Sequence, residues 1–320
     1  AMLQGPQGVE LVQESSYLVH QPQADSLNPL DEGGWLQRLV SDTATHVLVL
    51  DVRTNLAVEA IQQIRAQGVL IVTIDDPSER RLAADMAFYP PVPQVERMDW
   101  KEFTGKRFIG WDWVLLRSEF AKHRHSAAGQ DTCRSVCKDK SKPIKILVTM
   151  GGSDPAGLTL QVLKALDQIK RRLHVIVVLG RGFMHEVNLR RWLPLARRRY
   201  ELRYDVQDMP ATMAEAHIAI ASFGVTAYEL AVMGLPSAYL CLSEDHAESA
   251  VAFVSENLGI NIGTYFDLNP KEIRRKIENM LDETTVLPQG SNEIVDGRGA
   301  MRIASRISKT LLLSKTDHHF

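Results

Sequence analysis

Short apolar runs alternate with longer amphipathic stretches along most of the chain. Residues 45–51 and 69–76 are apolar runs that end in acidic residues, and residues 55–67 between them carry apolar side chains at helical spacing. Continuous apolar strands separated by helices are typical of parallel strands that are buried on both faces of a sheet. The pattern therefore predicts an α/β layer structure for the first half of the chain, with a helix that stops at Gly68 and a last element near Phe120.

The pattern is interrupted between residues 121 and 143, where charged residues, two histidines and Pro143 indicate a linker between domains. The alternation then resumes and predicts strands at 144–150, 174–179, 200–204, 217–221 and 236–242, with helices at 157–170, 185–199, 210–216 and 225–233. Two α/β halves joined by a linker predict a cleft between them, where ligands of open α/β sheets bind.

The composition is that of a globular protein, because 45% of the 320 residues are hydrophobic and 24% are charged. Thirty-seven Lys and Arg against 39 Asp and Glu leave a formal charge of −2, so no overall basic field attracts nucleic acid. The arginines between residues 190 and 199 are expected to form a solvated helix face. The longest apolar runs are far shorter than the ~18 residues that cross a bilayer, so we expect no integral membrane segment.

The three cysteines cannot all pair and none lies in a Cys-x-x-Cys motif, which favours a reduced, cytoplasmic location. Cys133 and Cys137 lie near His123 and His125, but the spacing of the two cysteines fits no standard zinc finger. We therefore expect no metal, and we expect no cofactor.

The strongest local motif is the turn Gly151-Gly152-Ser153, which follows a predicted strand and precedes a predicted helix. Such a turn presents backbone N–H groups at a helix N-terminus, where the helix dipole favours an anion and the missing β-carbons let a phosphate approach. The alternative is a tight turn in which Ser153 or Asp154 caps the helix.

A second turn of the same kind occupies residues 221–229. Ser222 and Thr226 supply hydroxyls around Gly224, at the start of the predicted helix, and Glu229 follows Thr226 by three residues on the same helix face. A carboxylate at this position can accept two hydrogen bonds from a ribose diol. The alternative role of Glu229 is to stabilise the helix dipole from the first turn. Two such turns in one α/β half favour a nucleotide diphosphate site.

A third candidate is the polar segment that follows the strand at 236–242. Asp245 and His246 lie there at the carboxyl end of the strand, which is the binding edge of a parallel sheet. His246 could donate to a phosphate or act as an acid or base near neutral pH. An ordinary surface loop explains the segment equally well.

Five segments together resemble one enzyme family. Residues 110–120, GWDWVLLRSEF, are similar to its signature G-x-x-Y-x-L-L-R-x-E-F, and residues 146–159, ILVTMGGSDPAGLT, are similar to ILVSFGGSDPxNLT. Residues 217–229, 234–236 and 296–300 complete the series in the same order. The family is that of the UDP-2,4-diacetamido-2,4,6-trideoxy-β-L-altropyranose hydrolases of pseudaminic acid biosynthesis. Its relatives act in spore-coat polysaccharide synthesis, and it is related to the MurG-type glycosyltransferases.

The resemblance implies a GT-B-like fold, with two Rossmann-like domains that contain parallel sheets and enclose a cleft. It implies an N-terminal domain in residues 1–125, a linker in 126–143, a nucleotide-binding domain in 144–300 and a final helix in 301–320 that packs back on the N-terminal domain. The ligand implied is a UDP-sugar. The two glycine turns would hold its diphosphate, Glu229 would bind the ribose, and the backbone near Val206 would contact the uracil.

The sequence departs from the family pattern in the half that carries the catalytic residue of the family. The family's opening strand and G-x-G-H-x-x-R loop have no counterpart, so the N-terminal domain is expected to lack the first βαβ unit. The family's D-x-Y reads Asp51-Val52-Arg53, and its N-Q pair reads Asp245-His246. Three functions follow as alternatives: a UDP-sugar hydrolase with Asp245 and His246 as catalytic candidates, a nucleotide-sugar-binding or scaffold protein without activity, and a MurG-like glycosyltransferase.

Overall fold

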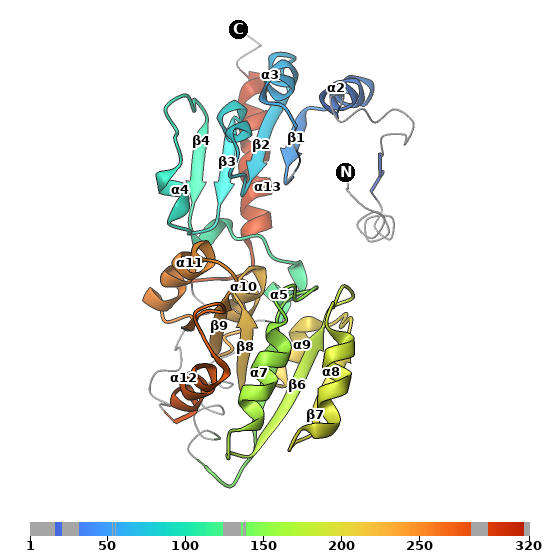
Figure 1. The fold of residues 1–320 in the computed structure, drawn as a ribbon. Coiled ribbons are helices and arrows are strands. Elements are labelled where there is room, and N and C mark those ends of the chain that lie inside the picture. Colours follow the sequence, from blue (N-terminus) through green and yellow to red (C-terminus); the bar gives the residue numbers. More distant parts are fainter. Residues whose placement is uncertain are drawn as a thin grey trace. The chain divides into compact units, whose positions relative to one another are not determined.

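The computed structural model describes residues 17–20, 32–52, 54, 56–123, 136, 139–282 and 294–316 (Figure 1). The chain divides into two compact units. Unit 1 comprises Ala1–Phe88 and Asp99–Arg107, and unit 2 comprises Tyr89–Met98 and Phe108–Phe320. Arg53 of the Asp51-Val52-Arg53 segment and the candidate metal ligands His125, Cys133 and Cys137 lie outside the described residues.

The first 109 residues contain a described parallel sheet in the order β1-β2-β3-β4. The elements are α2 (Glu32–Asp42), β1 (Val47–Leu50), α3 (Val58–Ala66), β2 (Leu70–Ile74), η3 (Glu79–Ala83), β3 (Met86–Tyr89), α4 (Gln94–Arg97) and β4 (Lys106–Ile109). Pairing is parallel between β1 and β2 and between β2 and β3. Leu36 of α2 and Ile61 and Ile64 of α3 pack with Ile71 of β2, so the predicted strand–helix–strand pattern is confirmed.

Strand β1 differs from the prediction that it is buried on both faces. Val49 is 45% exposed, and only Leu50 of this strand is buried. The reason is its place in the described sheet, where β1 is an edge strand that pairs with β2. An edge strand receives less cover than a central one, and the apolar sequence alone does not reveal the strand order.

Unit 2 is built on a parallel sheet whose described strands follow the order β10-β9-β8-β5-β6-β7. Its elements after β4 are η4 (Trp111–Trp113), α5 (Ser118–Lys122), β5 (Ile144–Thr149), α7 (Leu158–Asp167), β6 (Leu173–Leu179), α8 (Glu186–Trp192), η5 (Leu193–Leu195), β7 (Tyr200–Tyr204), α9 (Met209–Ala214), β8 (Ile218–Ser222), α10 (Val225–Val232), β9 (Ser237–Cys241), α11 (Glu244–Ser255), β10 (Ile260–Thr264), α12 (Pro270–Asp282) and α13 (Gly299–Thr316). The chain runs outward from β5 to β7, returns, and continues on the other side of β5 from β8 to β10. The order therefore reverses between β5 and β8.

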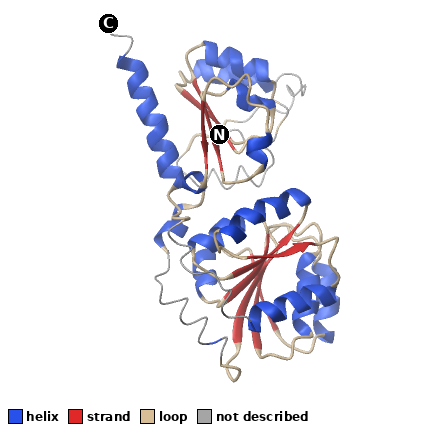
Figure 2. Cartoon of the chain, turned by 90° about the vertical axis from the view of Figure 1, so that its left-hand side faces the viewer, coloured by secondary structure: helices blue, strands red, loops and turns tan. Residues whose placement is uncertain are grey.

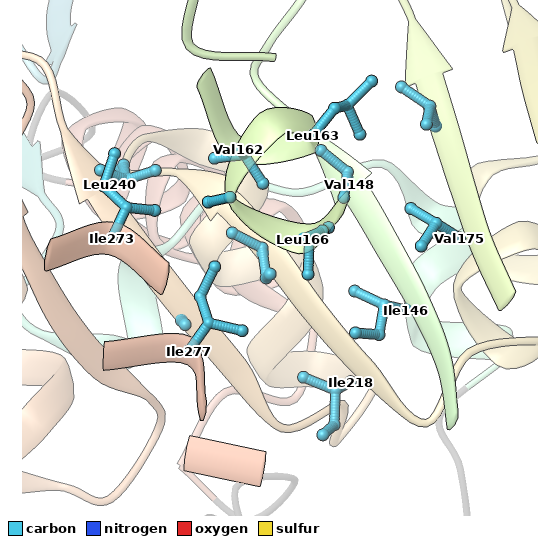
Figure 3. Packing of buried hydrophobic residues seen from close by; sticks show 14 of the residues in the cluster. Ile146, Val148, Val162, Leu163, Leu166, Val175, Ile218, Leu240, Ile273 and Ile277 are labelled. Carbon is cyan, nitrogen blue, oxygen red and sulfur yellow. The ribbon is translucent and has the colours of Figure 1, made fainter. Parts of the chain in front are cut away.

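Helices cover both faces of this sheet (Figure 2). On one face, Val162 and Leu166 of α7 and Ile277 of α12 pack against strand residues such as Ile146 of β5 and Ile218 of β8 (Figure 3). Alternate strand residues face the other way and join a second cluster with α5, α9, α10 and α11. Strands that are buried on both faces are the structure that the continuous apolar runs predicted for this half.

Two sequence interpretations are wrong in this unit. The polar segment after β9 is the start of a helix rather than a loop, because the Ser243 hydroxyl accepts a hydrogen bond from the His246 N–H and caps α11. The predicted helix at 185–199 ends at Trp192. The arginines that follow it are not all on a solvated helix face, since the N–H groups of Arg197 and Arg198 donate to the Asp167 carboxylate.

The predicted linker is described only in part. Val136 lies in the hydrophobic core of unit 2, and the Arg171 guanidinium donates to the carbonyl oxygens of Val136 and Asp139. Helix α13 belongs to unit 2 and contacts η4. Its packing on the N-terminal domain stays a prediction. None of the helices in the described part of the chain combines the length and the apolar character needed to cross a membrane.

Candidate functional site

The two glycine turns predicted from the sequence lie next to each other in unit 2. They follow β5 and β8, which are neighbours in the sheet and flank the point where the strand order reverses. A β-carbon placed on Gly151 would lie 3.7 Å from the Ser222 hydroxyl oxygen. Gly151 has a φ of 80°, which favours glycine. Ligands of open α/β sheets bind beyond the carboxyl ends of the strands at such a reversal.

The first turn presents its own N–H groups, whereas the N-terminus of α7 is already occupied. Asp154 is 2% exposed, and its two carboxylate oxygens accept hydrogen bonds from the N–H groups of Leu158 (2.8 Å) and Thr159 (2.9 Å). The expectation that α7 offers free N–H groups to an anion is therefore wrong, and Asp154 is the cap that the alternative interpretation required. Gly152 and Ser153 are exposed, and the space where a Gly152 side chain would lie is open.

A loop that the sequence analysis did not identify supports this turn from behind. It follows β6 and contains Gly180 and Gly182. A β-carbon on Gly180 would collide with the backbone of Gly152, and the Met184 N–H donates to the Ser153 carbonyl oxygen at 3.2 Å. The close approach of two backbones thus requires glycine at residue 180. In the sequence, the only signal for this role of Gly180 is the Gly-x-Gly spacing of residues 180–182 directly after the strand.

The second turn leads into a helix that begins at a glycine. Gly224 is the N-cap residue of α10 and has no side chain that could accept a hydrogen bond from the first turn of this helix. Ser222 is 7% exposed, Thr226 is half-buried, and Val225 is 65% exposed. The N–H groups at the start of α10 therefore lie near the hydroxyls of Ser222 and Thr226 and near the glycine turn after β5. This arrangement suits an anion.

Glu229 lies on α10 beyond its first turn, so the alternative role as a first-turn dipole residue does not fit. Its side chain is 13% exposed, and its Oε1 lies 3.7 Å from Nη2 of Arg117. Burial raises the pKa of Glu229, the Arg117 guanidinium opposes that rise, and Glu119 adds to it. The nearest described cation to this carboxylate is thus supplied by the segment before α5.

His246 and Asp245 lie in the first turn of α11, after the neighbouring strand β9. The His246 ring is 6.2 Å from the Phe223 ring of the second turn, and its Nδ1 is buried without a hydrogen-bond partner in the described structure. Burial lowers the pKa of His246, while the Asp245 carboxylate raises it. The Asp245 carbonyl oxygen accepts from Gln94 Nε2 at 2.7 Å, so α4 anchors this turn of α11.

Val206 lies farther along the same edge, in the connection between β7 and α9. It is half-buried against the cluster that contains α9 and α10. The preceding residue, Asp205, forms an ion pair with Arg181 at 2.9 Å, which joins the connection after β7 to the loop after β6. The structure thus places every predicted site residue on the carboxyl edge of one sheet. Within the described residues, no three His, Cys, Asp or Glu side chains gather to hold a metal ion.

Comparison with known proteins identifies two related groups. The chain is 27% identical over 204 residues to the spore coat polysaccharide biosynthesis protein SpsG of Bacillus subtilis strain 168. This match covers 62% of this chain and 57% of SpsG. It is 28% identical over 120 residues to the UDP-N-acetylglucosamine–N-acetylmuramyl-(pentapeptide) pyrophosphoryl-undecaprenol N-acetylglucosamine transferase of Brucella suis biovar 1 (strain 1330), covering 35% of this chain and 31% of that enzyme. The matched part thus spans about half of the first relative and about a third of the second.

Solved structures with the same fold include MurG of Acinetobacter baumannii, with a TM-score of 0.65 at 13% identity over 94% of this chain and 88% of that one. Anabaena Alr3699/HepE, solved in complex with UDP-glucose, has a TM-score of 0.57 at 13% identity over 96% and 89%. These neighbours confirm the predicted fold, which is GT-B with two Rossmann-like domains. The sequence relatives confirm the predicted relation to the SpsG and MurG groups.

The family match falls on the unit that contains the glycine turns. It extends from residue 146 in β5 to residue 307 in α13, which is more than half of the 320 residues. The chain belongs to the glycosyltransferase family 28 C-terminal domain family.

Proposed function

We propose that unit 2 binds a UDP-sugar at the carboxyl edge of its sheet. The observation that carries this proposal is the adjacency of the turns after β5 and β8 at the reversal of strand order, with Glu229 one turn farther along α10. The small residues of both turns, with Gly152 and Ser153 exposed and α10 beginning at Gly224, suit a diphosphate. The complex of Anabaena HepE with UDP-glucose, a protein of the same fold, supports the choice of nucleotide.

Each part of the ligand has a proposed partner along the edge. The diphosphate lies against Gly151, Gly152, Ser153, Ser222, Gly224 and Thr226. The Glu229 carboxylate accepts the ribose hydroxyls, and the backbone at Val206 contacts the uracil. Asp245 and His246 lie after β9, beyond the second turn, and are proposed to contact the sugar or its phosphate.

The proposed reaction is the release of UDP from an activated amino sugar. Water attacks the anomeric carbon, the bond from that carbon to the phosphate oxygen breaks, and UDP leaves. Because burial lowers the pKa of His246, its imidazole is neutral at pH 7 and its unpartnered Nδ1 can accept a proton or a hydrogen bond. The relation to SpsG, a spore coat polysaccharide biosynthesis protein, supports a role in surface polysaccharide synthesis. The resemblance of the sequence motifs to the hydrolase family makes nonulosonic acid synthesis, such as that of pseudaminic acid, part of the same proposal.

A second candidate reaction is sugar transfer to an acceptor other than water. The family match and the relation to the Brucella transferase favour it. Both reactions use the same UDP site, and a protein that binds without turnover would use it too.

Binding is tested by calorimetric titration with UDP, ADP and GDP, together with a thermal shift. At 100 times the dissociation constant, UDP should stabilise the fold by about 2.7 kcal/mol, and the purine nucleotides should bind less tightly. No shift with millimolar UDP, together with a shift by another nucleotide, would contradict the proposal.

The reaction is tested by measuring UDP release from a panel of UDP-amino sugars, with and without the chain. Release in water that is lost in His246→Ala assigns hydrolysis and gives His246 the catalytic role. If the chain binds UDP but release stays at the background rate, two functions remain: sugar transfer to another acceptor, and binding without turnover. Adding candidate acceptors distinguishes these two functions.

A further inference from the structure

The segment from Trp111 to Phe120 has no role in the proposed function so far. It contains η4 and α5, and it is anchored in unit 2 by Val114, Leu116 and Phe120, of which Phe120 is fully buried. All three belong to the hydrophobic cluster that contains the buried residues of α10. The segment is therefore packed against the helix that carries Glu229.

The backbone of this segment is also held from the other side. A β-carbon on Gly299 would collide with the Val114 carbonyl oxygen, and one on Gly297 would lie 3.2 Å from the backbone of Ala121. Next to these glycines, the Asp296 carboxylate accepts hydrogen bonds from both terminal nitrogens of Arg302. The turn before α13 thus fixes both ends of the stretch that contains Arg117.

Arg117 projects from this fixed backbone toward α10. Its Nη1 forms an ion pair with Glu119 at 2.8 Å, its Nη2 lies 3.7 Å from Glu229, and its guanidinium lies over the Phe120 ring at 5.2 Å from the ring centre. The Arg117 side chain is 54% exposed, and its guanidinium is oriented by contacts with one buried ring and two carboxylates.

The groups around Glu229 leave Arg117 as the cation that acts on it. Helix α10 packs against α5, β8 and β9, and its Tyr228 ring also contacts Phe253 of α11 and Trp111 of η4. Among the charged residues of these elements, Asp112 lies on η4 and Glu244, Asp245, His246 and Glu248 lie on α11, but only Arg117 and Glu119 act on the pKa of Glu229. Strand β8 carries no titratable side chain, and β9 carries only Tyr239 and Cys241. From the side of α5, Arg117 lowers the pKa of Glu229 and Glu119 raises it, against the rise that burial causes. A buried carboxylate without a facing cation favours its neutral form, which accepts hydrogen bonds poorly.

We propose that Arg117 is a positioning residue for the nucleotide, which holds the Glu229 side chain as a carboxylate directed at the ribose diol. This inference rests on the proposed function, because it assumes that Glu229 binds ribose. Under this proposal, a residue outside the two glycine turns contributes to nucleotide affinity. That residue, Arg117, lies in the segment that packs against Gly297 and Gly299.

The test is the pH dependence of UDP affinity, measured by calorimetry between pH 5 and 9. Affinity falls as the pH drops through the pKa of Glu229, because protonation removes an acceptor from the ribose. In Arg117→Gln, the midpoint of this fall should move to higher pH by about 0.5–1 unit, so that well below the wild-type midpoint UDP should bind about 3- to 10-fold more weakly than to the wild type. Arg117→Lys should restore most of the wild-type profile, and Glu119→Gln should move the midpoint to lower pH.

Two controls separate a positioning role from a structural one. Arg190→Gln removes an exposed arginine of α8 that pairs with Glu186, and its profile should overlay that of the wild type. The ligand 2′-deoxy-UDP lacks one of the two hydroxyls, so its binding should be weaker and should depend less on pH. A merely structural loss in Arg117→Gln would weaken UDP and 2′-deoxy-UDP equally at every pH.

Failure of this inference is distinguishable from failure of the proposed function. If the wild type binds UDP and the Arg117→Gln profile overlays it, the role of Arg117 is refuted and the UDP site stands. If the wild type binds no UDP, the UDP site is refuted. The pKa of Glu229 can then still be measured from the pH titration of its carboxyl carbon by NMR, with the signal assigned by comparison with Glu229→Gln. This titration reports whether Arg117→Gln or Arg117→Lys changes the pKa of Glu229. An unchanged titration overturns the inference.

Discussion

The carboxyl ends of parallel strands are used differently in the two units. In unit 1, the fully buried Asp76 follows β2 and accepts hydrogen bonds from Ser78 and from Nε of Arg80 (2.9 Å). The Arg80 guanidinium also donates to the carbonyl oxygens of Val52 and Thr54, after β1. The charges at this edge therefore join two loops of the protein to each other.

In unit 2, Asp154 at the corresponding edge caps α7 and Asp205 pairs with Arg181, but this edge also contains two glycine turns, and α10 begins at Gly224. The described strands of the first sheet follow one another in sequence order, whereas the second sheet reverses its order between β5 and β8. An acidic residue at the end of a strand is thus a poor indicator of chemistry when an arginine four residues later can pair with it. If the proposed UDP site is confirmed, small turns at a reversal of strand order are the better indicator.

The largest effect is expected from removing the buried carboxylate of unit 1. Asp76→Ala leaves Arg80, which is 5% exposed, without its partner, and breaking a buried ion pair in this way costs about 3–5 kcal/mol of folding free energy. Chemical denaturation measures the loss. UDP affinity should stay at the wild-type value under conditions where the variant is folded.

Glu79→Ala is the matched control, because Glu79 is an exposed carboxylate in the same turn. It should change stability by less than about 0.5 kcal/mol. A loss of UDP affinity in Asp76→Ala larger than in Glu79→Ala would show that the edge of unit 1 takes part in binding, and the contrast between the two edges would fail.

A smaller effect is expected at the loop that supports the first glycine turn. In Gly180→Ala, the added methyl group collides with the backbone of Gly152, and such overpacking costs about 1–3 kcal/mol. Because the collision displaces the turn that is proposed to bind diphosphate, we expect UDP affinity to fall about tenfold. The comparison variant is Gly182→Ala, whose new methyl group meets atoms at 3.6 Å or more. Equal affinities in the two variants would refute the supporting role of the loop.

The sequence predicted strands β5 to β9 and the two turns of unit 2, because their signals are local, whereas β10 was not predicted. The apolar runs of β5 and β8 and the glycines after them can be recognised within ten residues of chain. Helix α12 also has local signals that were not used. Asn269 and Glu272 exchange backbone-to-side-chain hydrogen bonds in a capping box, and Ile273 and Ile277 are spaced by one turn.

The rest of the site could not be predicted, because it depends on contacts between distant parts of the chain. The role of Asp154 could not be decided from the sequence, since an aspartate after two glycines can face a ligand or cap the next helix. Gly180 matters only because β6 lies beside β5. The contact of Arg117 with Glu229 joins residues 112 positions apart, and no spacing rule connects them.

Glu229→Gln tests the edge of unit 2 without altering its shape. If Glu229 binds ribose, the loss of a charged acceptor should weaken UDP by about 1–3 kcal/mol and leave the melting temperature close to that of the wild type. Glu278→Gln, on the exposed face of α12 where Glu278 pairs with Arg274, is the control and should bind UDP normally. A variant that loses stability and keeps its UDP affinity would show that Glu229 is a structural residue.

The smallest effect is expected from the titration of His246. It tests whether the phosphate site extends from the two glycine turns to the start of α11. Burial lowers the pKa of His246 below its usual 6.5 in the folded protein. Above pH 6.5 the imidazole is neutral in both the folded and the unfolded chain, so it adds no pH dependence. Below that value the unfolded chain takes up the proton first, and the stability of the fold decreases as the pH falls toward the lowered pKa. His246→Asn should lose less stability than the wild type over this range. A diphosphate near the imidazole would favour its charged form, so UDP binding at pH 6 should take up more protons in the wild type than in His246→Asn. Calorimetry in two buffers of different ionisation enthalpy measures this uptake. Equal proton uptake in both proteins would place His246 outside the phosphate site and limit that site to the turns after β5 and β8.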